Sequence, residues 1–232
     1  MALTNVLLLS QIAGHVIGLI VSLCMIVPMS MHLHDFKGKC LLFSGGTWED
    51  NGYLKVTWAS RAYCDYVIAI GVLTFIVCSV QIYRLSMFMY KGADSSFLSA
   101  FLEAVGSAIM CLLTVCTAII MTLGFMSWCQ IIVMRFTSCE AGAGQSIDKD
   151  DQIQTSGFYI ETGAAQFGAW AAFATWVGLA VFSTLKVCRY HQRENIQVSM
   201  FRERQRLVNE SGSPTTQDHT GRSTPPLEAG AQ

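Results

Sequence analysis

Charged residues are scarce in this chain of 232 residues and make up 13% of it, whereas an average soluble domain holds about 25%. Glu103 is the one formally charged residue inside four apolar runs, which are residues 6–29, 66–83, 97–128 and 162–185. A helix of about 20 apolar residues crosses the roughly 30 Å hydrocarbon core of a bilayer. The pattern predicts an all-α membrane protein with a four-helix transmembrane bundle.

Signals that would change this assignment are also missing. Residues 1–5 lack the basic charge of a secretory signal, and no small-residue cleavage site follows Pro28, so we interpret the first run as a retained signal-anchor. Ala2 excludes N-myristoylation, which needs glycine at that position. The net charge is −1 without a concentrated basic surface outside the tail, which argues against a nucleic-acid partner. We expect one membrane domain, residues 1–191, whose first partner is the lipid bilayer.

A C-x-x-C pair, whose close spacing tunes the redox potential of many oxidoreductases, is absent from the sequence. Four cysteines instead occupy the two loops after the first and third runs, which share one side of the membrane: Cys40, Cys64, Cys129 and Cys139. Three pairings are open. We favour Cys40–Cys64 and Cys129–Cys139 because each closes within one loop, while pairing between the loops stays an alternative. Structural disulfides are thus favoured over a membrane thiol oxidoreductase.

Two signals orient the bundle. Basic residues are denser in the short loop 84–96 and at the start of the tail than in the longer loops 30–61 and 129–161, and this positive-inside bias places both termini in the cytosol. Cysteine pairs persist as disulfides in an oxidising compartment, the lumen or the exterior. Both signals predict a multi-pass protein of the plasma membrane or an endomembrane, with the cysteine-bearing loops outside.

The first outer loop contains two predicted strands. Residues 53–58 alternate between an apolar and a polar face, which is typical of a strand. Residues 40–43 form a shorter candidate that the Gly45-Gly46 pair is expected to end as a turn. Two strands alone are marginal in water. We therefore expect a small extracellular β-sheet that is held by packing on the membrane domain and by a disulfide.

Few polar side chains interrupt the apolar runs. An acid within a span costs a few kcal/mol unless it is paired or hydrated, so Glu103 is a functional hypothesis. The alternative is that it reaches the cytosolic interface near Arg84 or Lys91. His15 is expected to hydrogen-bond between helices, and the small residues within 163–178 predict close helix packing more than a docking face.

One pair of histidines could suggest a metal site. His32 and His34 would share a face if they lay on a strand, with Asp35 pointing away, and the remaining ligands would have to come from elsewhere. We predict no metal site, no cofactor and no catalytic residues, and hence no enzyme.

The C-terminal part differs in composition. Residues 192–232 are assigned to a cytosolic amphipathic segment and a disordered tail, since the tail is too polar to bury a core. Residues 186–208 predict a basic helix whose arginines within 202–206 suit an interfacial helix on anionic lipid, with a solvated charged helix as the alternative. Cys188 lies where S-palmitoylation commonly occurs, and an unmodified thiol is an equal alternative.

Several segments resemble a known family. They are His-Asp-Phe-Lys-Gly-Lys-Cys-Leu-Leu-Phe at 34–43, Phe-Leu-Ser-Ala-Phe-Leu at 97–102, Gly-Phe and Trp-Cys within 124–129, and Ala-Gln-Phe-Gly at 165–168. In this order they are similar to the transmembrane protein 179 family. The resemblance implies a claudin-like four-span fold with a small β-sheet in the first outer loop closed by a disulfide. It brings no catalytic residues.

Claudins carry a Gly-Leu-Trp signature before a closely spaced cysteine pair, and here Thr47-Trp48 and a wider cysteine spacing stand in its place. Tight-junction barrier activity is therefore not implied. We expect a non-enzymatic protein that acts by lateral or adhesive association, either as an auxiliary subunit or adhesion scaffold of another integral membrane protein or by self-association. The alternatives are a vesicle-trafficking tetraspan and, third, a thiol oxidoreductase or transporter.

Overall fold

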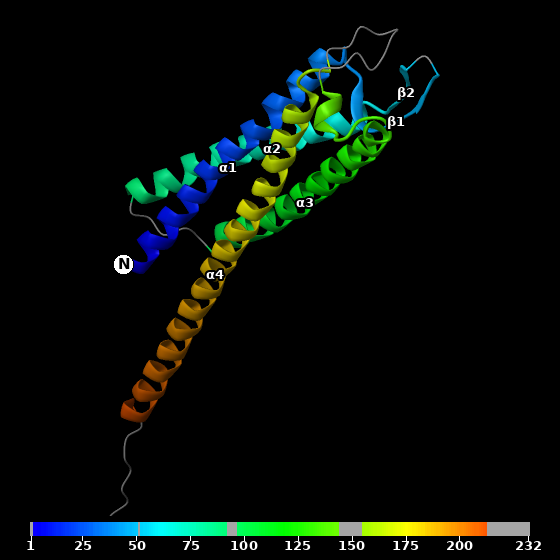
Figure 1. Cartoon of the computed structure of the whole chain (residues 1–232). Coiled ribbons are helices and arrows are strands. Elements are labelled where there is room, and N and C mark those ends of the chain that lie inside the picture. Colours follow the sequence, from blue (N-terminus) through cyan, green and yellow to red (C-terminus); the bar gives the residue numbers. More distant parts are fainter. Residues whose placement is uncertain (1, 51, 92–96, 144–154, 213–232) are drawn as a thin grey trace, which may run out of the picture. The chain divides into compact units, whose positions relative to one another are not determined.

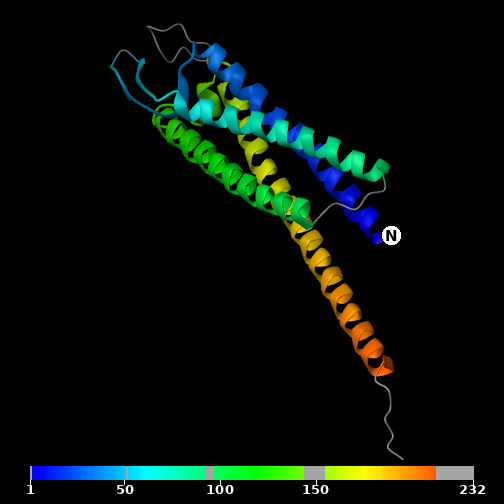
Figure 2. The same ribbon diagram turned by 180° about the vertical axis from the view of Figure 1, so that it is seen from behind.

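The computed structural model describes residues 2–50, 52–91, 97–143 and 155–212, with side chains described from residue 6 to residue 209. The elements in chain order are α1 (Ala2–Asp35), β1 (Cys40–Trp48), β2 (Leu54–Ala59), α2 (Ala62–Lys91), α3 (Phe97–Val133), the short 3-10 helix η1 (Glu140–Gly142) and α4 (Phe158–Gly212). Chain contacts divide the protein into two units, Met1–Tyr190 and His191–Gln232. In the first unit the four helices run side by side, with the two strands at one end and the N-terminus at the other (Figures 1 and 2).

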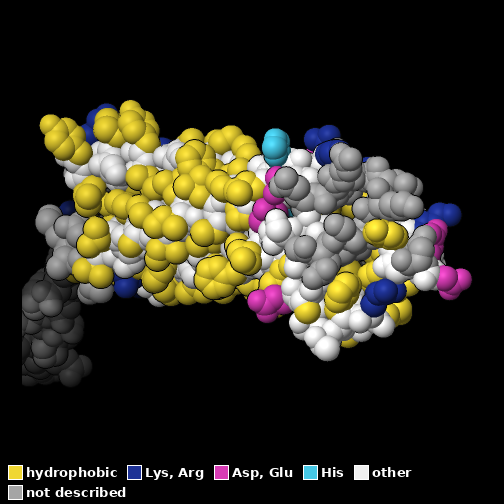
Figure 3. Space-filling view, turned by 45° about the horizontal axis from the view of Figure 1, so that its top comes forward, with side chains coloured by type: hydrophobic (Ala, Val, Ile, Leu, Met, Phe, Trp, Pro, Cys, Tyr) yellow, Lys and Arg dark blue, Asp and Glu magenta, His cyan; other side chains and the backbone are white. Residues whose placement is uncertain are grey.

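All four long helices are apolar and long enough to cross a membrane. Many of their large aliphatic side chains point outward, as Ile20, Ile76 and Leu112 do with 60%, 52% and 66% of their surface exposed. Such a surface is unfavourable in water and matched to lipid. Figure 3 shows hydrophobic side chains spread over the helices on the face in view, with most charged side chains gathered at the end that carries the strands. The predicted four-span membrane bundle is confirmed, and the protein is integral to the membrane.

Small residues let the helices approach one another closely. On α4 three alanines are fully buried in the largest core cluster: Ala165, Ala169 and Ala172. A Cβ added to Gly168 would lie 3.1 Å from the backbone nitrogen of Met25 in α1, and one added to Gly18 would lie 2.7 Å from the Cys78 sulfur in α2. Helix association in lipid depends on such close van der Waals contact. Four of the small residues of α4 therefore pack inside the bundle: Ala165, Gly168, Ala169 and Ala172.

The two strands form an antiparallel hairpin in the loop between α1 and α2, as the sequence predicts. Leu54 is buried while Lys55 and Thr57 are exposed, so the alternation along β2 follows the expected faces. The predicted turn at Gly45-Gly46 is wrong. Instead β1 continues to Trp48, and the chain reverses at Gly52, whose φ is 91°.

Glycines in mid-strand have a packing reason here. A Cβ on Gly46 would lie 2.8 Å from the Lys55 carbonyl oxygen and 3.0 Å from a methyl group of Leu54. The register slips between Cys40 and Gly45, where Phe43 takes a φ of 62°. Gly46 therefore allows the two strands to approach one another next to a bulge, which is one of the established uses of glycine inside a strand. A Cβ on Gly45 would meet nothing within 4 Å.

Two helices continue beyond the apolar runs to support the hairpin. On α3, Trp128 and Ile132 are buried in a cluster with Leu54 of β2 and with Phe158 at the start of α4. α1 continues to Asp35. The extra length of α3 thus has a structural function, since its last turns form a platform for the strands.

The second unit contains the C-terminal part of α4. From residue 191 to residue 209 it is helical and exposed on every side. The predicted basic helix at 186–208 lies within α4, and Ser213 and Thr224, which precede prolines in the tail, lie outside the described residues.

Candidate functional site

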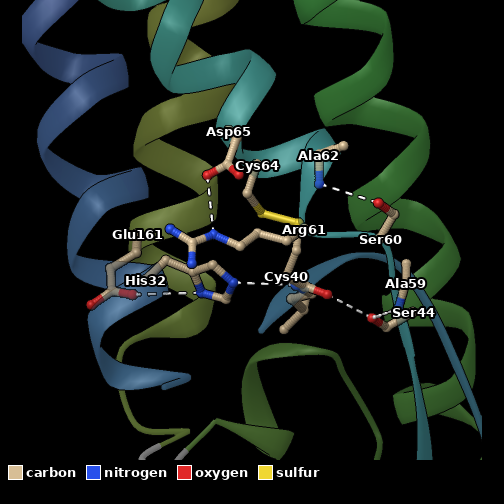
Figure 4. The surroundings of a disulfide bond; sticks show 11 residues. His32, Cys40, Ser44, Ala59, Ser60, Arg61, Ala62, Cys64, Asp65 and Glu161 are labelled. Atoms are coloured by element: carbon tan, nitrogen blue, oxygen red, sulfur yellow. Dashed lines mark hydrogen bonds and ion pairs between the residues drawn. A yellow bond between two sulfur atoms is a disulfide. The ribbon is translucent and has the colours of Figure 1, made fainter. Parts of the chain in front are cut away.

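A disulfide fastens the hairpin to the bundle. Cys40, the first residue of β1, is bonded to Cys64 in the first turn of α2, 24 positions along the chain, and both are fully buried. Figure 4 shows that the bond lies among side chains from α1, α2, α4 and both strands. Ser44 joins the strands beside it, donating to the Cys40 carbonyl oxygen at 2.7 Å and accepting from the Ala59 N–H at 3.0 Å. The bond and Ser44 hold the start of β1 in place.

His32 supplies a second attachment for the hairpin. Its Nε2 accepts a hydrogen bond from the Leu41 N–H at 3.3 Å, and its Nδ1 lies 4.0 Å from a carboxylate oxygen of Glu161 on α4. An accepting Nε2 places the ring proton on Nδ1, so the neutral imidazole faces the carboxylate. His32 is almost fully buried, whereas His34 is exposed. His32 therefore links α1 to β1 and faces α4.

The strand geometry assumed for His32 and His34 is wrong. Both histidines belong to α1, and residues two apart on a helix do not face each other. No group of three histidine, cysteine, aspartate or glutamate residues suited to a metal ion occurs in the part of the chain that the structure describes.

The tip of the hairpin is attached to α3. Trp48 donates from Nε1 to the Ile131 carbonyl oxygen at 3.0 Å, and the Arg135 guanidinium lies 5.2 Å from its ring centroid. The loop after α3 is closed by a disulfide between Cys129 and Cys139. Both disulfides are the within-loop pairs that the sequence favours. Because this packing uses one side of the hairpin, the other side stays exposed, and we call it the hairpin face: Thr47, Tyr53, Lys55 and Thr57.

A polar cluster lies at the opposite end of the bundle. Glu103 on α3 accepts from the Lys186 ammonium of α4 at 3.0 Å and from the Gln11 amide of α1 at 2.7 Å. The same Gln11 nitrogen lies 3.4 Å from the Ser183 hydroxyl. All four side chains are buried. This Glu103 cluster (Gln11, Glu103, Ser183 and Lys186) joins three helices through one carboxylate.

The partner of Glu103 differs from the expected one. Arg84 bonds Gln81 at 3.2 Å and Ser99 at 2.9 Å instead, tying α2 to the start of α3. Lys186 lies 83 positions from Glu103 in the sequence, so local spacing gives no sign of the pair. Helix length indicates only a similar depth for the two residues, since Glu103 lies about 45 Å from the end of α3 at Val133 and Lys186 about 42 Å from the start of α4 at Phe158.

The same count locates the Glu103 cluster relative to the membrane. From Gln11 to His32 α1 measures about 31 Å, and from Glu161 to Lys186 α4 measures about 37 Å, at about 1.5 Å per residue. A hydrocarbon core roughly 30 Å thick, crossed with some tilt, fits between the Glu103 cluster at one end and His32 with Glu161 at the other. The cluster therefore lies at the bilayer boundary opposite the hairpin, where its ion pair and hydrogen bonds hold three helices together.

The remaining candidate residues are spread apart. His15 is buried, and its ring meets the edge of Trp176 at 5.9 Å between centroids; among described residues its Nδ1 has no hydrogen-bond partner. Its contact with α4 is thus aromatic, whereas a hydrogen bond was expected. Gln166 does form a hydrogen bond between helices, donating to Thr122 of α3 at 3.1 Å. Cys188 is an exposed free cysteine on α4.

Comparison with known proteins identifies the architecture. No solved structure matches the chain. Residues 7–208 match the family described as Transmembrane protein 179/179B Claudin domain, a stretch that includes the hairpin, the bundle and the exposed part of α4 as far as residue 208. The segments at 34–43, 97–102, 124–129 and 165–168 that suggested this family from the sequence alone lie inside the match, and the chain belongs to the transmembrane protein 179/179B family of claudin-like four-span membrane proteins.

Proposed function

We propose that this chain is a non-enzymatic scaffold that presents the hairpin face to another integral membrane protein, as an auxiliary or adhesive partner. The observation that carries the proposal is the contrast between the two sides of the hairpin. One side is attached to the bundle through the Cys40–Cys64 bond, His32 and Trp48. The other side is exposed.

Attachment at several points matters for binding. A loop that is already ordered loses little conformational entropy when a partner covers it, and such preorganisation strengthens binding without further contacts. The hairpin face combines an aromatic ring at Tyr53, a positive charge at Lys55 and hydroxyl groups at Thr47 and Thr57. These groups suit a polar partner surface that carries an acidic residue opposite Lys55.

The orientation supports the same proposal. Disulfides at Cys40–Cys64 and Cys129–Cys139 persist in an oxidising compartment. The exposed part of α4 carries arginines, which favour the cytosolic side. Both termini are then cytosolic, and the hairpin face projects into the lumen or the exterior, where the loops of other membrane proteins lie.

Proximity labelling of the full-length protein in cells tests the proposal. We expect one integral membrane protein to dominate the labelled neighbours and to be lost, or reduced at least fivefold, when Lys55→Glu is combined with Tyr53→Ser. Lys37→Glu is the matched control, because it makes the same charge change at another exposed lysine of the same loop. We expect it to leave the neighbours unchanged.

Two results would contradict the scaffold proposal. One is a set of neighbours that the hairpin-face variants do not alter. The other is labelling dominated by vesicle cargo, which would favour the trafficking alternative. Surface biotinylation of each variant shows that it reaches the same membrane, so a change in neighbours is not a change in location.

A further inference from the structure

A groove lies on the lipid-facing side of the junction between α3 and α4. It is lined by Cys111 of α3 and by five residues of α4: Val177, Ala180, Val181, Thr184 and Leu185. Val181 and Leu185 expose 53% and 48% of their surface. The Thr184 hydroxyl already donates to the Ala180 carbonyl oxygen at 2.7 Å. The groove is therefore apolar toward a ligand, and its volume of about 340 Å³ lies within the range of small-molecule sites, about 300–1,000 Å³.

The groove extends through one leaflet of the bilayer. Lys186 belongs to the Glu103 cluster at the bilayer boundary, and Val177 lies about 14 Å deeper along α4. Half of a hydrocarbon core of roughly 30 Å is about 15 Å, which is the depth available to the acyl chain of one lipid. The groove therefore matches a single fatty acyl chain that enters at the boundary and ends near the midplane.

Cys188 lies at the boundary end of this groove. It is an exposed free cysteine within the first unit, Met1–Tyr190, and follows Lys186 by about 3 Å along the helix. At about 100° per residue, Val177 and Val181 lie about 20° to either side of Cys188, so all three side chains share one stripe of α4. Side chains on a helix lean toward its N-terminus, which for Cys188 is the direction of the groove. A chain attached to the Cys188 sulfur thus begins at the entrance of the groove.

The other free cysteines do not combine exposure with this depth. Cys78 is buried. Three more lie about 12–20 Å from the Glu103 cluster along their helices, inside the bilayer: Cys24, Cys111 and Cys116. Cys188 is therefore the free cysteine that a donor at the headgroup level reaches.

We infer that Cys188 carries a fatty acyl chain as a thioester, and that this chain lies in the groove between α3 and α4. The Cys188 sulfur attacks the carbonyl carbon of a fatty acyl thioester such as acyl-coenzyme A. A carbon–sulfur bond to Cys188 forms while the bond from the carbonyl carbon to the donor sulfur breaks, and the thiol proton passes to the departing thiolate. The exchange involves no oxidation or reduction.

The attached chain does more than anchor the protein, which four helices already hold in the membrane. It covers the junction of α3 and α4 on the lipid side, so the helix of another protein cannot pack there while the chain is present. Because S-acylation of juxtamembrane cysteines is reversible, removal of the chain opens this surface. The inference rests on the cytosolic position of Cys188 proposed above, and it does not depend on the partner of the hairpin face.

Thioester exchange on the full-length protein from cells tests the modification. Disulfides are reduced, all free thiols are blocked, hydroxylamine then cleaves thioesters, and each released thiol receives a mass tag. We expect one hydroxylamine-dependent tag that is lost in Cys188→Ser. Cys116→Ser is the matched control, because it removes another exposed free cysteine, and it should keep the tag.

A photoreactive fatty acid tests where the chain lies. Cells are fed a 16-carbon acid with a diazirine at its far end, and cross-linked peptides are mapped by mass spectrometry. We expect cross-links to residues 174–181 of α4 and 108–115 of α3 to fall at least fivefold in Cys188→Ser. Ala180→Phe, which fills the groove, should keep the thioester and lower these cross-links by a similar factor. Ala69→Phe makes the same change at an exposed position of α2 and should leave them unchanged.

Three outcomes would overturn the inference. One is a protein without a hydroxylamine-dependent tag, or with a tag that Cys188→Ser leaves in place. Another is a set of groove cross-links that Cys188→Ser does not alter, which would show that a free membrane lipid fills the groove. The third is a thioester on Cys188 whose cross-links are as frequent on α2 as in the groove.

The two disulfides separate this inference from the proposed function. Linked Cys40–Cys64 in each variant shows that the chain has folded, and free thiols there would show that the proposed orientation is wrong. Linked cysteines without a thioester would overturn the Cys188 inference alone. Neighbours that hairpin-face variants do not alter would contradict the scaffold proposal and leave the thioester unaffected.

Discussion

The buried ion pair between Glu103 and Lys186 offers a quantitative test of how the bundle is held together. Each charge has been removed from water, with 6% and 7% of the residues exposed, and the two groups are 3.0 Å apart. Removing one partner of a buried pair costs about 3–5 kcal/mol, because it leaves the other charge uncompensated. At the bilayer boundary the surviving charge can reach toward water, which favours the lower end of that range.

We therefore expect Glu103→Leu and Lys186→Met each to lower the free energy of unfolding by about 3 kcal/mol. The double variant leaves no unpaired charge. Its main remaining loss of stability comes from the Gln11 amide, which no longer has its bond to Glu103. An unsatisfied buried group of this kind lowers the free energy of unfolding by about 1–3 kcal/mol. The double variant should be at least as stable as either single variant, which corresponds to a coupling free energy of roughly 3–5 kcal/mol.

Unfolding titrations in mixed micelles, followed by tryptophan fluorescence, provide the measurement. The control is the cycle of Arg84→Gln and Ser99→Ala, which removes a half-buried bond between α2 and α3. We expect a coupling below about 1 kcal/mol there, since exposed and half-exposed charges are screened. Additive effects of the Glu103 and Lys186 variants, with a coupling near zero, would show that this ion pair does not hold the helices together.

Two further predictions concern α4 and the hairpin. Gly168→Ala should lower the free energy of unfolding by about 1–3 kcal/mol, because its Cβ would press on the α1 backbone. Gly178→Ala, which meets nothing within 4 Å, should be neutral or stabilising in the same titration, and equal losses would contradict the packing. His32→Leu should speed amide hydrogen exchange at Leu41, because the buried N–H loses its acceptor. Unchanged exchange, or the same change in His34→Leu, would contradict this attachment.

The fold could be predicted from the sequence because its main signal is composition. Four runs free of charge, apart from Glu103, fix the number of spans, since a bilayer tolerates few alternatives to a helix. Period-2 alternation likewise predicts β2, because one face of the strand is buried. Both signals are local, and both are confirmed by the structure.

Two predictions are wrong, the turn at Gly45-Gly46 and the strand geometry of His32 and His34, because tertiary contacts override a local signal. Gly45-Gly46 usually indicates a turn, yet here the pair lies within β1, where Leu54 and the Lys55 carbonyl leave no room for a side chain at position 46. Residues 30–35 lie beyond the first apolar run but stay helical, which separates His32 from His34. No local sequence pattern indicates the close approach of the strands or the continuation of α1 to Asp35.

The site was predictable in part. Cysteine positions and loop closure indicate the two disulfides, since each pair closes within one loop. The partner of Glu103 is not evident from the sequence, because Lys186 is one of several basic residues next to the apolar runs. Pairing it with Glu103 requires knowing that α3 and α4 are neighbours and that both residues lie at one depth. Helix length alone indicates the depth of each residue in the membrane, but not which helices are neighbours.

The most direct test of the attached hairpin and its proposed side of the membrane is the oxidation state of the cysteines in the protein taken from cells. Thiols are blocked on lysis without reduction, and the peptides are mapped by mass spectrometry. We predict peptides linked through Cys40–Cys64 and Cys129–Cys139, because a disulfide attaches the hairpin and we propose that the hairpin lies in an oxidising compartment. Free, blocked thiols at Cys40 and Cys64 would contradict both the attachment of the hairpin and its proposed side of the membrane.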